Sequence, residues 1–183
     1  MPYFYTQQQS VPMKYLYTFI LLVSLNSTGQ AQEINWISFE EAIAKNKSAP
    51  KNILIDVYTD WCGYCKKMDR ETYENEVIIS IINENFYAVK LNAEQREDIT
   101  YKDKTFTFVK NGRRGYHEFA AGLLQGKMSY PSTVFLDQNE AIIDKIPGYL
   151  APDIMEKILV YLGNRHYEET SFEKFQETFI SKL

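Results

Sequence analysis

The architecture of this protein is organised around one segment, Ile55-Asp56-Val57-Tyr58-Thr59-Asp60-Trp61-Cys62-Gly63-Tyr64-Cys65-Lys66-Lys67. The run that leads into it, residues 52–58, is rich in apolar residues and has the length of a buried strand. From Tyr64 to about Arg70 the residues suit a helix, so the two cysteines lie where a strand passes into a helix. A disulfide between cysteines this close in sequence closes a loop too small to restrict the unfolded chain much. The spacing therefore favours chemistry over a structural staple.

The rest of the chain alternates short strands with helices. Ser38-Phe39-Glu40-Glu41 is a capping box that predicts a helix to about Asn46. Pro152 and Gly163 are expected at the first and the C′ positions of a final core helix. Apolar periodicity and turn residues predict a helix at 75–85, a strand at 87–91, a strand at 105–109 with a turn at 111–112, a helix at 117–124, an antiparallel hairpin of 133–136 with 141–146, and a helical tail within 171–183. This order predicts an α/β fold with a central mixed β-sheet flanked by helices.

The cysteine segment resembles the active-site segment of the thioredoxin superfamily, including its position between a strand and a helix. A second landmark, Tyr130-Pro131-Ser132-Thr133 just before a predicted strand, is similar to the cis-proline loop of that superfamily. The resemblance covers about residues 36–162. It implies a thioredoxin-like fold with an insertion at 99–124 before the cis-proline loop, and the activity of a thiol–disulfide oxidoreductase.

The places of the two cysteines predict a division of labour. A thiol is strongly nucleophilic only as the thiolate, and a helix N-terminus lowers the pKa of a thiol placed there. Cys62 is expected at that N-terminus and exposed, and Cys65 one turn further in and shielded. We therefore expect Cys62 to attack the substrate and Cys65 to resolve the mixed disulfide.

Asp56 is an anomaly in an otherwise apolar strand. It is either a carboxylate at the solvated end of the strand or a buried acid of raised pKa that takes the proton of Cys65. Its position six residues before Cys62 matches the buried acid of the superfamily, and Lys90 matches the lysine beside that acid.

Pro131 is either a proline at a strand edge or, as the resemblance implies, part of a cis Tyr130–Pro131 bond. In the second case the backbone of Tyr130 is offered to an extended substrate by strand addition. Trp61 and Tyr64 are expected beside it as further substrate-binding residues. The dipeptide Gly63-Tyr64 is similar to that of bacterial periplasmic disulfide isomerases, so the expected activity is that of a reductase or an isomerase.

Copper binding is one alternative function, and a non-catalytic binding module with a vestigial cysteine pair is another. Cys62, Cys65 and Met68 are soft ligands that could hold Cu(I), whereas a four-ligand zinc site would need partners beyond His117 and His166. His117 is expected to mark a helix start and His166 to be solvated. The insertion at 99–124 is either a lid that sets specificity or added core packing. No cofactor is expected.

Residues 1–31 have the features of an export signal. Lys14 is followed by a short apolar run, Tyr15 to Leu25, and Gly29 and Ala31 fit a signal peptidase site with cleavage after Ala31. The chain has 183 residues and a net charge of −4; loss of Lys14 leaves −5 on residues 32–183. This balance argues against nucleic-acid binding. We expect a periplasmic or secreted monomer with no membrane span after signal removal. Its domain is expected at 32–183, with a helical tail at 164–183. The expected partners are protein thiols and disulfides as substrates and a separate protein that recycles the redox pair. The true start is Met1 or Met13.

Overall fold

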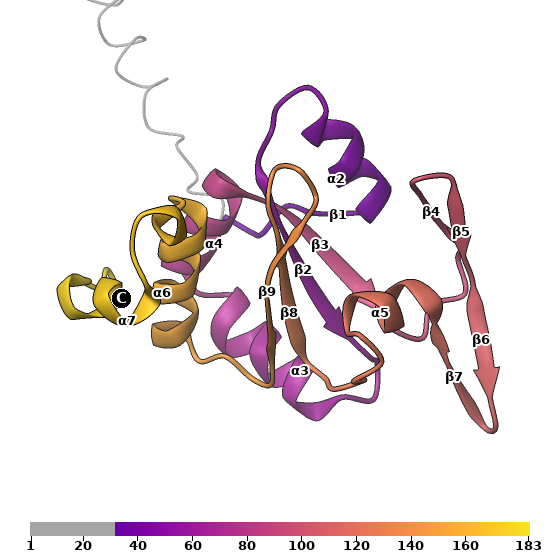
Figure 1. The fold of residues 1–183 in the computed structure, drawn as a ribbon. Coiled ribbons are helices and arrows are strands. Elements are labelled where there is room, and N and C mark those ends of the chain that lie inside the picture. Colours follow the sequence, from indigo (N-terminus) through magenta and orange to yellow (C-terminus); the bar gives the residue numbers. More distant parts are fainter. Residues whose placement is uncertain (1–31) are drawn as a thin grey trace, which may run out of the picture. The chain divides into compact units, whose positions relative to one another are not determined.

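A computed structural model describes residues 32–183 of the chain (Figure 1). The expected signal segment, its cleavage after Ala31 and the choice between Met1 and Met13 lie outside the described residues. They stay predictions.

A five-stranded mixed sheet forms the centre of the fold, in the order β1-β3-β2-β8-β9. Its strands are β1 (Trp36–Ile37), β2 (Asn52–Tyr58), β3 (Phe86–Asn92), β8 (Ser132–Leu136) and β9 (Ile142–Pro147). Strands β1, β3 and β2 pair in parallel, and β8 runs antiparallel to β2 and to β9. The predicted mixed sheet and the predicted hairpin of its last two strands are confirmed.

Helices cover both faces of this sheet. They are α2 (Phe39–Asn46), α3 (Gly63–Met68), α4 (Glu76–Asn85), α5 (Glu118–Leu123) and α6 (Pro152–Gly163). Helix α7 (Phe172–Thr178) packs against α6, where the rings of Phe172 and Tyr161 lie 5.1 Å apart. Side chains of α2 and α5 form one core cluster with Ile53, Ile55 and Val57 of β2, while α3, α4 and α6 form the other with Leu54. Because side chains alternate along a strand, Asp56 points to the same side as Leu54, toward the layer that contains α3.

The insertion between β3 and the cis-proline loop forms two small hairpins and α5. The first pairs β4 (Ile99–Tyr101) with β5 (Lys104–Phe106), and the second pairs β6 (Phe108–Asn111) with β7 (Arg114–His117). The single strand predicted at 105–109 is wrong. It is broken at Thr107, whose N–H donates to the Glu118 carboxylate at 3.0 Å instead of to a strand. Ile99, Phe119 and Leu124 are buried in the second core cluster, so part of the insertion does add core packing.

Helix ends differ from the predictions at two places. Helix α3 continues without a break into a π-helix at Asp69–Tyr73, beyond the predicted end near Arg70. Gly163 is the last residue of α6 and not its C′ residue. It serves close packing, because a Cβ there would lie 3.0 Å from Asn85 and from the ring of Phe86. Among the helices of residues 32–183, none is long and apolar enough to cross a membrane.

Candidate active site

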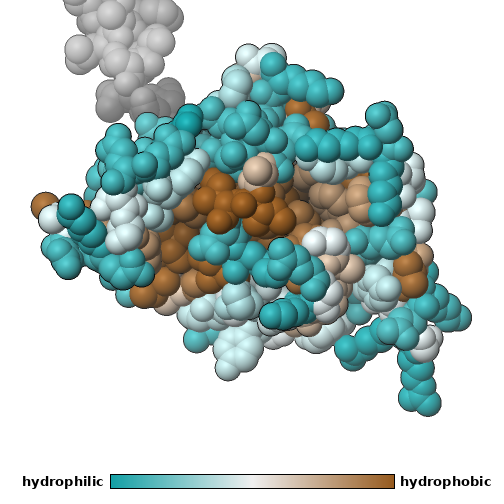
Figure 2. All heavy atoms as spheres, viewed as in Figure 1, coloured by the Kyte–Doolittle hydropathy of each residue, from teal (hydrophilic) through white to brown (hydrophobic). Residues whose placement is uncertain are grey.

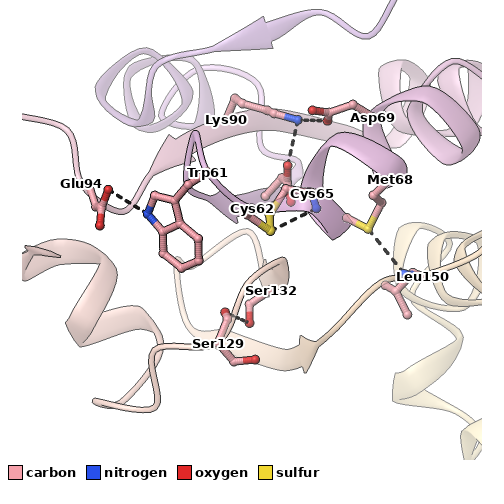
Figure 3. Close-up of a disulfide and its surroundings, with 11 residues drawn as sticks. Trp61, Cys62, Cys65, Met68, Asp69, Lys90, Glu94, Ser129, Ser132 and Leu150 are labelled. Atoms are coloured by element: carbon pink, nitrogen blue, oxygen red, sulfur yellow. Dashed lines mark hydrogen bonds and ion pairs between the residues drawn. A yellow bond between two sulfur atoms is a disulfide. The ribbon is translucent and has the colours of Figure 1, made fainter. Parts of the chain in front are cut away.

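The two cysteines form a disulfide at the start of α3 (Figure 3). Cys62 is the N-cap residue of this helix, with extended backbone angles, and its sulfur accepts a hydrogen bond from the Cys65 N–H at 3.1 Å. A sulfur in this position receives the free N–H groups of the first helical turn, which favour the thiolate. The predicted placement of the pair between β2 and a helix is therefore confirmed.

The predicted exposure of Cys62 is wrong for this oxidised form. Cys62 is 5% exposed and Cys65 is 2% exposed, so both are buried. The reason is the N-cap geometry together with the disulfide, which turn the Cys62 side chain back onto the helix. In this form a substrate would have to reach Cys62 through the small part of its surface that is exposed.

A cis-proline loop precedes β8. The Tyr130–Pro131 peptide bond is cis, as the resemblance implies. The carbonyl of Pro131 accepts from the Gly148 N–H at 2.8 Å, and the Ser132 hydroxyl donates to the Ser129 carbonyl at 2.8 Å. Within residues 32–183 the backbone N–H and C=O of Tyr130 form no hydrogen bond. Both groups are thus available to an extended chain.

Three aromatic side chains stand around the disulfide. Trp61 is 52% exposed and Tyr64 is 66% exposed. The Trp61 indole N–H donates to Glu94 at 3.0 Å, and its ring meets that of Tyr130 edge-on at 5.9 Å. Burial, with the Glu94 carboxylate, raises the pKa of the Tyr130 phenol to about 12. Such rings offer apolar contact to a polypeptide beside Cys62.

Asp56 is buried and paired. It lies opposite Lys90 in the β2–β3 register, and neighbours in register share a face of the sheet. The Lys90 ammonium lies 2.9 Å from one carboxylate oxygen of Asp56, and the other oxygen has no hydrogen-bond partner within residues 32–183. Burial raises the pKa of Asp56, an effect that outweighs the opposing attraction of Lys90. The reading of Asp56 as a solvated strand end is therefore wrong.

Lys90 has further neighbours that sequence reasoning missed. Its ammonium also pairs with Asp69 of the π-helix. The ammonium lies over three rings, at 4.9 Å from Trp36, 5.3 Å from Tyr58 and 5.0 Å from Tyr73. Burial lowers the pKa of Lys90, but Asp56 and Asp69 raise it more, so Lys90 stays charged. Asp69 lies four residues after Cys65, on the same face of a helix, and this spacing is the signal that could have found it.

Met68 does not face the disulfide. It is fully buried, and its sulfur accepts from the Leu150 N–H at 3.4 Å (Figure 3). His117 is buried as the N-cap of α5 and accepts from the Phe119 N–H at 3.2 Å, as its predicted place at a helix start requires. In the part of the chain that the structure describes, no cluster of three or more His, Cys, Asp or Glu residues could hold a metal. The copper interpretation therefore lacks its third ligand.

Comparison with known sequences agrees with this arrangement. The chain matches the model of a family described as the thioredoxin-like domain over residues 39–163. It is 34% identical over 133 residues to a protein disulfide-isomerase of Schizosaccharomyces pombe, covering 73% of this chain and 29% of that protein. It is 33% identical over 84 residues to the uncharacterized protein B0495.5 of Caenorhabditis elegans, covering 45% of this chain. The chain spans only 10 to 12% of the length of that protein and of the spermatogenesis-associated protein 20 of two rodents.

Solved structures show a similar fold. A thioredoxin from Thermus thermophilus is 14% identical, with a TM-score of 0.53 over 71% of this chain and 87% of its own. A proposed disulphide-isomerase from Bacteroides thetaiotaomicron is 21% identical, with a TM-score of 0.53 over 78% of this chain and 99% of its own. At these identities the likeness is one of fold.

Proposed function

The chain belongs to the thioredoxin-like domain family, and from this premise we propose that it exchanges disulfides with protein substrates through Cys62 and Cys65. The observation that carries the proposal is the disulfide at the N-terminus of α3, combined with a cis-proline loop and a buried Asp56–Lys90 pair. The disulfide closes a loop too short to stabilise the fold much, which already argues against a structural bridge. The buried ion pair has no comparable structural purpose, since pairs of this kind stabilise a fold little.

In the direction of substrate reduction, the Cys62 thiolate attacks one sulfur of a substrate disulfide and releases a substrate thiolate. Cys65 then loses its proton and attacks the Cys62 sulfur, which releases the second substrate thiol. Two electrons pass from the protein dithiol to the substrate, and the Cys62–Cys65 disulfide remains. The reverse steps oxidise a substrate, and an incomplete cycle isomerises one.

Asp56 is the base in this proposal. Cys65 is buried, so water has little access to its proton. A carboxylate of raised pKa accepts that proton at near-neutral pH more readily than one of ordinary pKa. The free backbone groups of Tyr130 would align an extended substrate, and Trp61 and Tyr64 would contact it on either side.

Reduction of insulin disulfides tests the activity. We expect the dithiol-reduced protein to reduce insulin, and the double variant Cys62→Ser/Cys65→Ser to be inactive. Equal rates for the two proteins would refute the proposal. Titration of the reduced protein with Cu(I), with Met68→Leu as the matched variant, tests the copper alternative. Tight binding that depends on Met68, together with absent insulin reduction, would support that alternative instead.

The physiological direction depends on the reduction potential of the pair. Equilibration of the protein with glutathione measures it, and about 30 mV corresponds to about 1.4 kcal/mol for this two-electron couple. We propose reductase or isomerase activity, for which a potential closer to that of thioredoxin than to that of a strong oxidase is expected. A strongly oxidising potential would contradict it.

We also propose that the protein acts as a monomer outside the cytoplasm, recycled by a separate redox protein. Lys14, the short apolar run and the small residues before Gln32 support the export part of this proposal. Protein purified from its native host should begin at Gln32. An N-terminal sequence that retains residues 13–31 would refute the cleavage.

A further inference from the structure

The β6–β7 hairpin differs in charge from the rest of the protein. Residues Phe108–His117 contain three basic side chains, Lys110, Arg113 and Arg114, and no acidic one. The other described residues together carry a net charge of −8. All three basic side chains are exposed, and within residues 32–183 none of them forms an ion pair. Figure 2 shows the hydrophilic tip projecting at the lower right, where Figure 1 places this hairpin.

The base of the hairpin is joined to the strand ends beside the active site. The His117 N–H donates to the Ala93 carbonyl at 2.7 Å, and the Ala93 N–H donates to the Tyr58 carbonyl at 2.8 Å. Tyr58 is the last residue of β2, four residues before Cys62. These backbone bonds hold the hairpin next to the segment that leads to the disulfide.

Side-chain packing also defines the shape of the hairpin. The Arg96 guanidinium lies over the Phe108 ring at 3.7 Å. Gly115 lies on β7, the strand that pairs with β6, and a Cβ there would lie 2.0 Å from the Phe108 ring. Only glycine therefore lets that ring cross β7. The basic side chains are thus presented by a braced hairpin and not by a free loop.

Arg114 links the hairpin to the aromatic rim of the site. Its guanidinium lies 4.5 Å from the centre of the Trp61 ring, and Trp61 directly precedes Cys62. Two acids are near Trp61 through the chain or through a hydrogen bond: Asp60 directly precedes it, and Glu94 accepts from its indole N–H. A further acid, Glu118, binds Thr107 near the base of the hairpin. Within residues 32–183 the three basic side chains of the hairpin form no ion pair, and one of them, Arg114, lies at the rim of the site.

We propose that this hairpin is a docking arm for polypeptides that carry acidic residues beside the disulfide to be exchanged. The inference rests on the proposed function and adds the class of substrate. Basic side chains at the rim of a site raise the rate of encounter with an acidic partner. The same charges add little once the partner is bound, because they remain solvated. The net negative charge of the remaining surface repels an acidic chain that approaches elsewhere, so the arm sets the direction of approach as well.

Two peptide disulfides that differ at three positions test this. One carries three Glu residues on one side of the cysteine, and the other carries three Gln residues at the same positions. At low ionic strength we expect the reduced protein to have a kcat/KM about tenfold higher for the Glu peptide. The ratio should fall toward one at about 0.5 M salt, because exposed charges are then screened. The triple variant K110Q/R113Q/R114Q should show a ratio near one already at low salt.

The control variant K47Q/K174Q/K182Q removes the same charge from exposed positions outside the hairpin, and it should keep the wild-type ratio. A triple hairpin variant that keeps the preference, or a control that loses it equally, would overturn the proposal. Reduction of the neutral 2-hydroxyethyl disulfide separates this failure from failure of the proposed function, since an inactive wild type would refute the function itself. Binding to anionic phospholipid vesicles that is lost in the hairpin variant, with the peptide ratio unchanged, would assign the arm to a membrane surface and refute the substrate class.

Discussion

Replacing Asp56 by Asn isolates the chemical role of the buried carboxylate. The substitution keeps the shape of the side chain but removes its ability to accept a proton. Lys90 is not left without a counter-charge, because Asp69 still pairs with it and three aromatic rings still surround it. The variant therefore changes the proton acceptor while the environment of Lys90 remains largely in place.

The expected kinetic effect falls on one step. A positioned general base contributes about 10²–10⁴-fold to a rate. Cys65 is buried, so bulk water replaces the base poorly. We expect resolution of the mixed disulfide by Cys65 to be slower by at least about 100-fold near pH 7. Attack by Cys62, whose sulfur is stabilised by the helix N-terminus, should change much less.

The stability of the oxidised protein gives a second readout. The pKa of Asp56 is raised in the folded state above its unfolded value, so the folded state holds its proton more tightly. This contribution to stability is fully present below the unfolded value of about 3.9 and is lost as the pH rises through the folded value. Each unit of difference costs the wild type about 1.4 kcal/mol at higher pH. The Asn variant lacks this loss, so at neutral pH its stability should equal or exceed that of the wild type.

Stopped-flow measurements with a model disulfide, from mildly acidic to mildly alkaline pH, follow both kinetic steps, and urea unfolding at pH 4 and pH 7 follows stability. Asp60→Asn is the matched control, because Asp60 is an exposed carboxylate in the same segment. It should affect neither readout. Resolution at the wild-type rate across the whole range by the Asp56 variant would show that Asp56 is not the base.

Three further predictions concern the neighbours of this carboxylate. The Cys65→Ser variant should accumulate mixed disulfides with substrates that are visible on non-reducing gels, and the Cys62→Ser variant should not. If Cys65 of the reduced wild type is alkylated faster than Cys62 at low pH, Cys65 is the attacking cysteine instead. Lys90→Met leaves Asp56 buried without its nearest counter-charge, so the free energy of unfolding in urea at pH 7 should fall by about 3 kcal/mol. This is the lower end of the range for a broken buried pair, because the Lys90 side chain is 22% exposed. An equal fall at pH 4, where protonation of Asp56 is favoured, would contradict this cause. Asp69→Asn should lower the free energy of unfolding by less than about 1 kcal/mol, because the side chain is 42% exposed. It also removes a charge that raises the pKa of Asp56, so the pH profile of the resolving step should move to lower pH. An unmoved profile would argue against this coupling.

Local sequence signals predicted the elements that position the site. The apolar run at 52–58 is strand β2 as observed, and the tetrad at 137–140 does connect two antiparallel strands. Asn75 and His117 cap the helices whose starts they mark. In each case the signal lies within the element itself, so no distant contact is needed to read it.

The features that no local signal shows depend on register and on distant contacts. The pairing of Asp56 with Lys90 follows from the alignment of β2 with β3, across 34 positions of sequence, and only the resemblance pointed to it. The place of Asp69 depends on the π-helix that prolongs α3. The contact of Arg114 with Trp61 depends on the backbone bonds that hold the second hairpin. Of these three, only the place of Asp69 has a short-range signal, which is its spacing of four residues from Cys65.

The charges around the disulfide act at two different stages of the proposed cycle. The buried Asp56 carboxylate lies behind α3 and serves the resolving step, which happens after the substrate is bound. The basic arm lies at the rim, where it changes the rate at which an acidic substrate meets Cys62. Because the two groups share no contact partner, their effects on the free energy of the transition states should add. Combining Asp56→Asn with K110Q/R113Q/R114Q should therefore slow resolution as much as the first change alone and abolish the peptide preference as fully as the second alone. A double variant in which either effect depended on the other would show that encounter and resolution are coupled through the site.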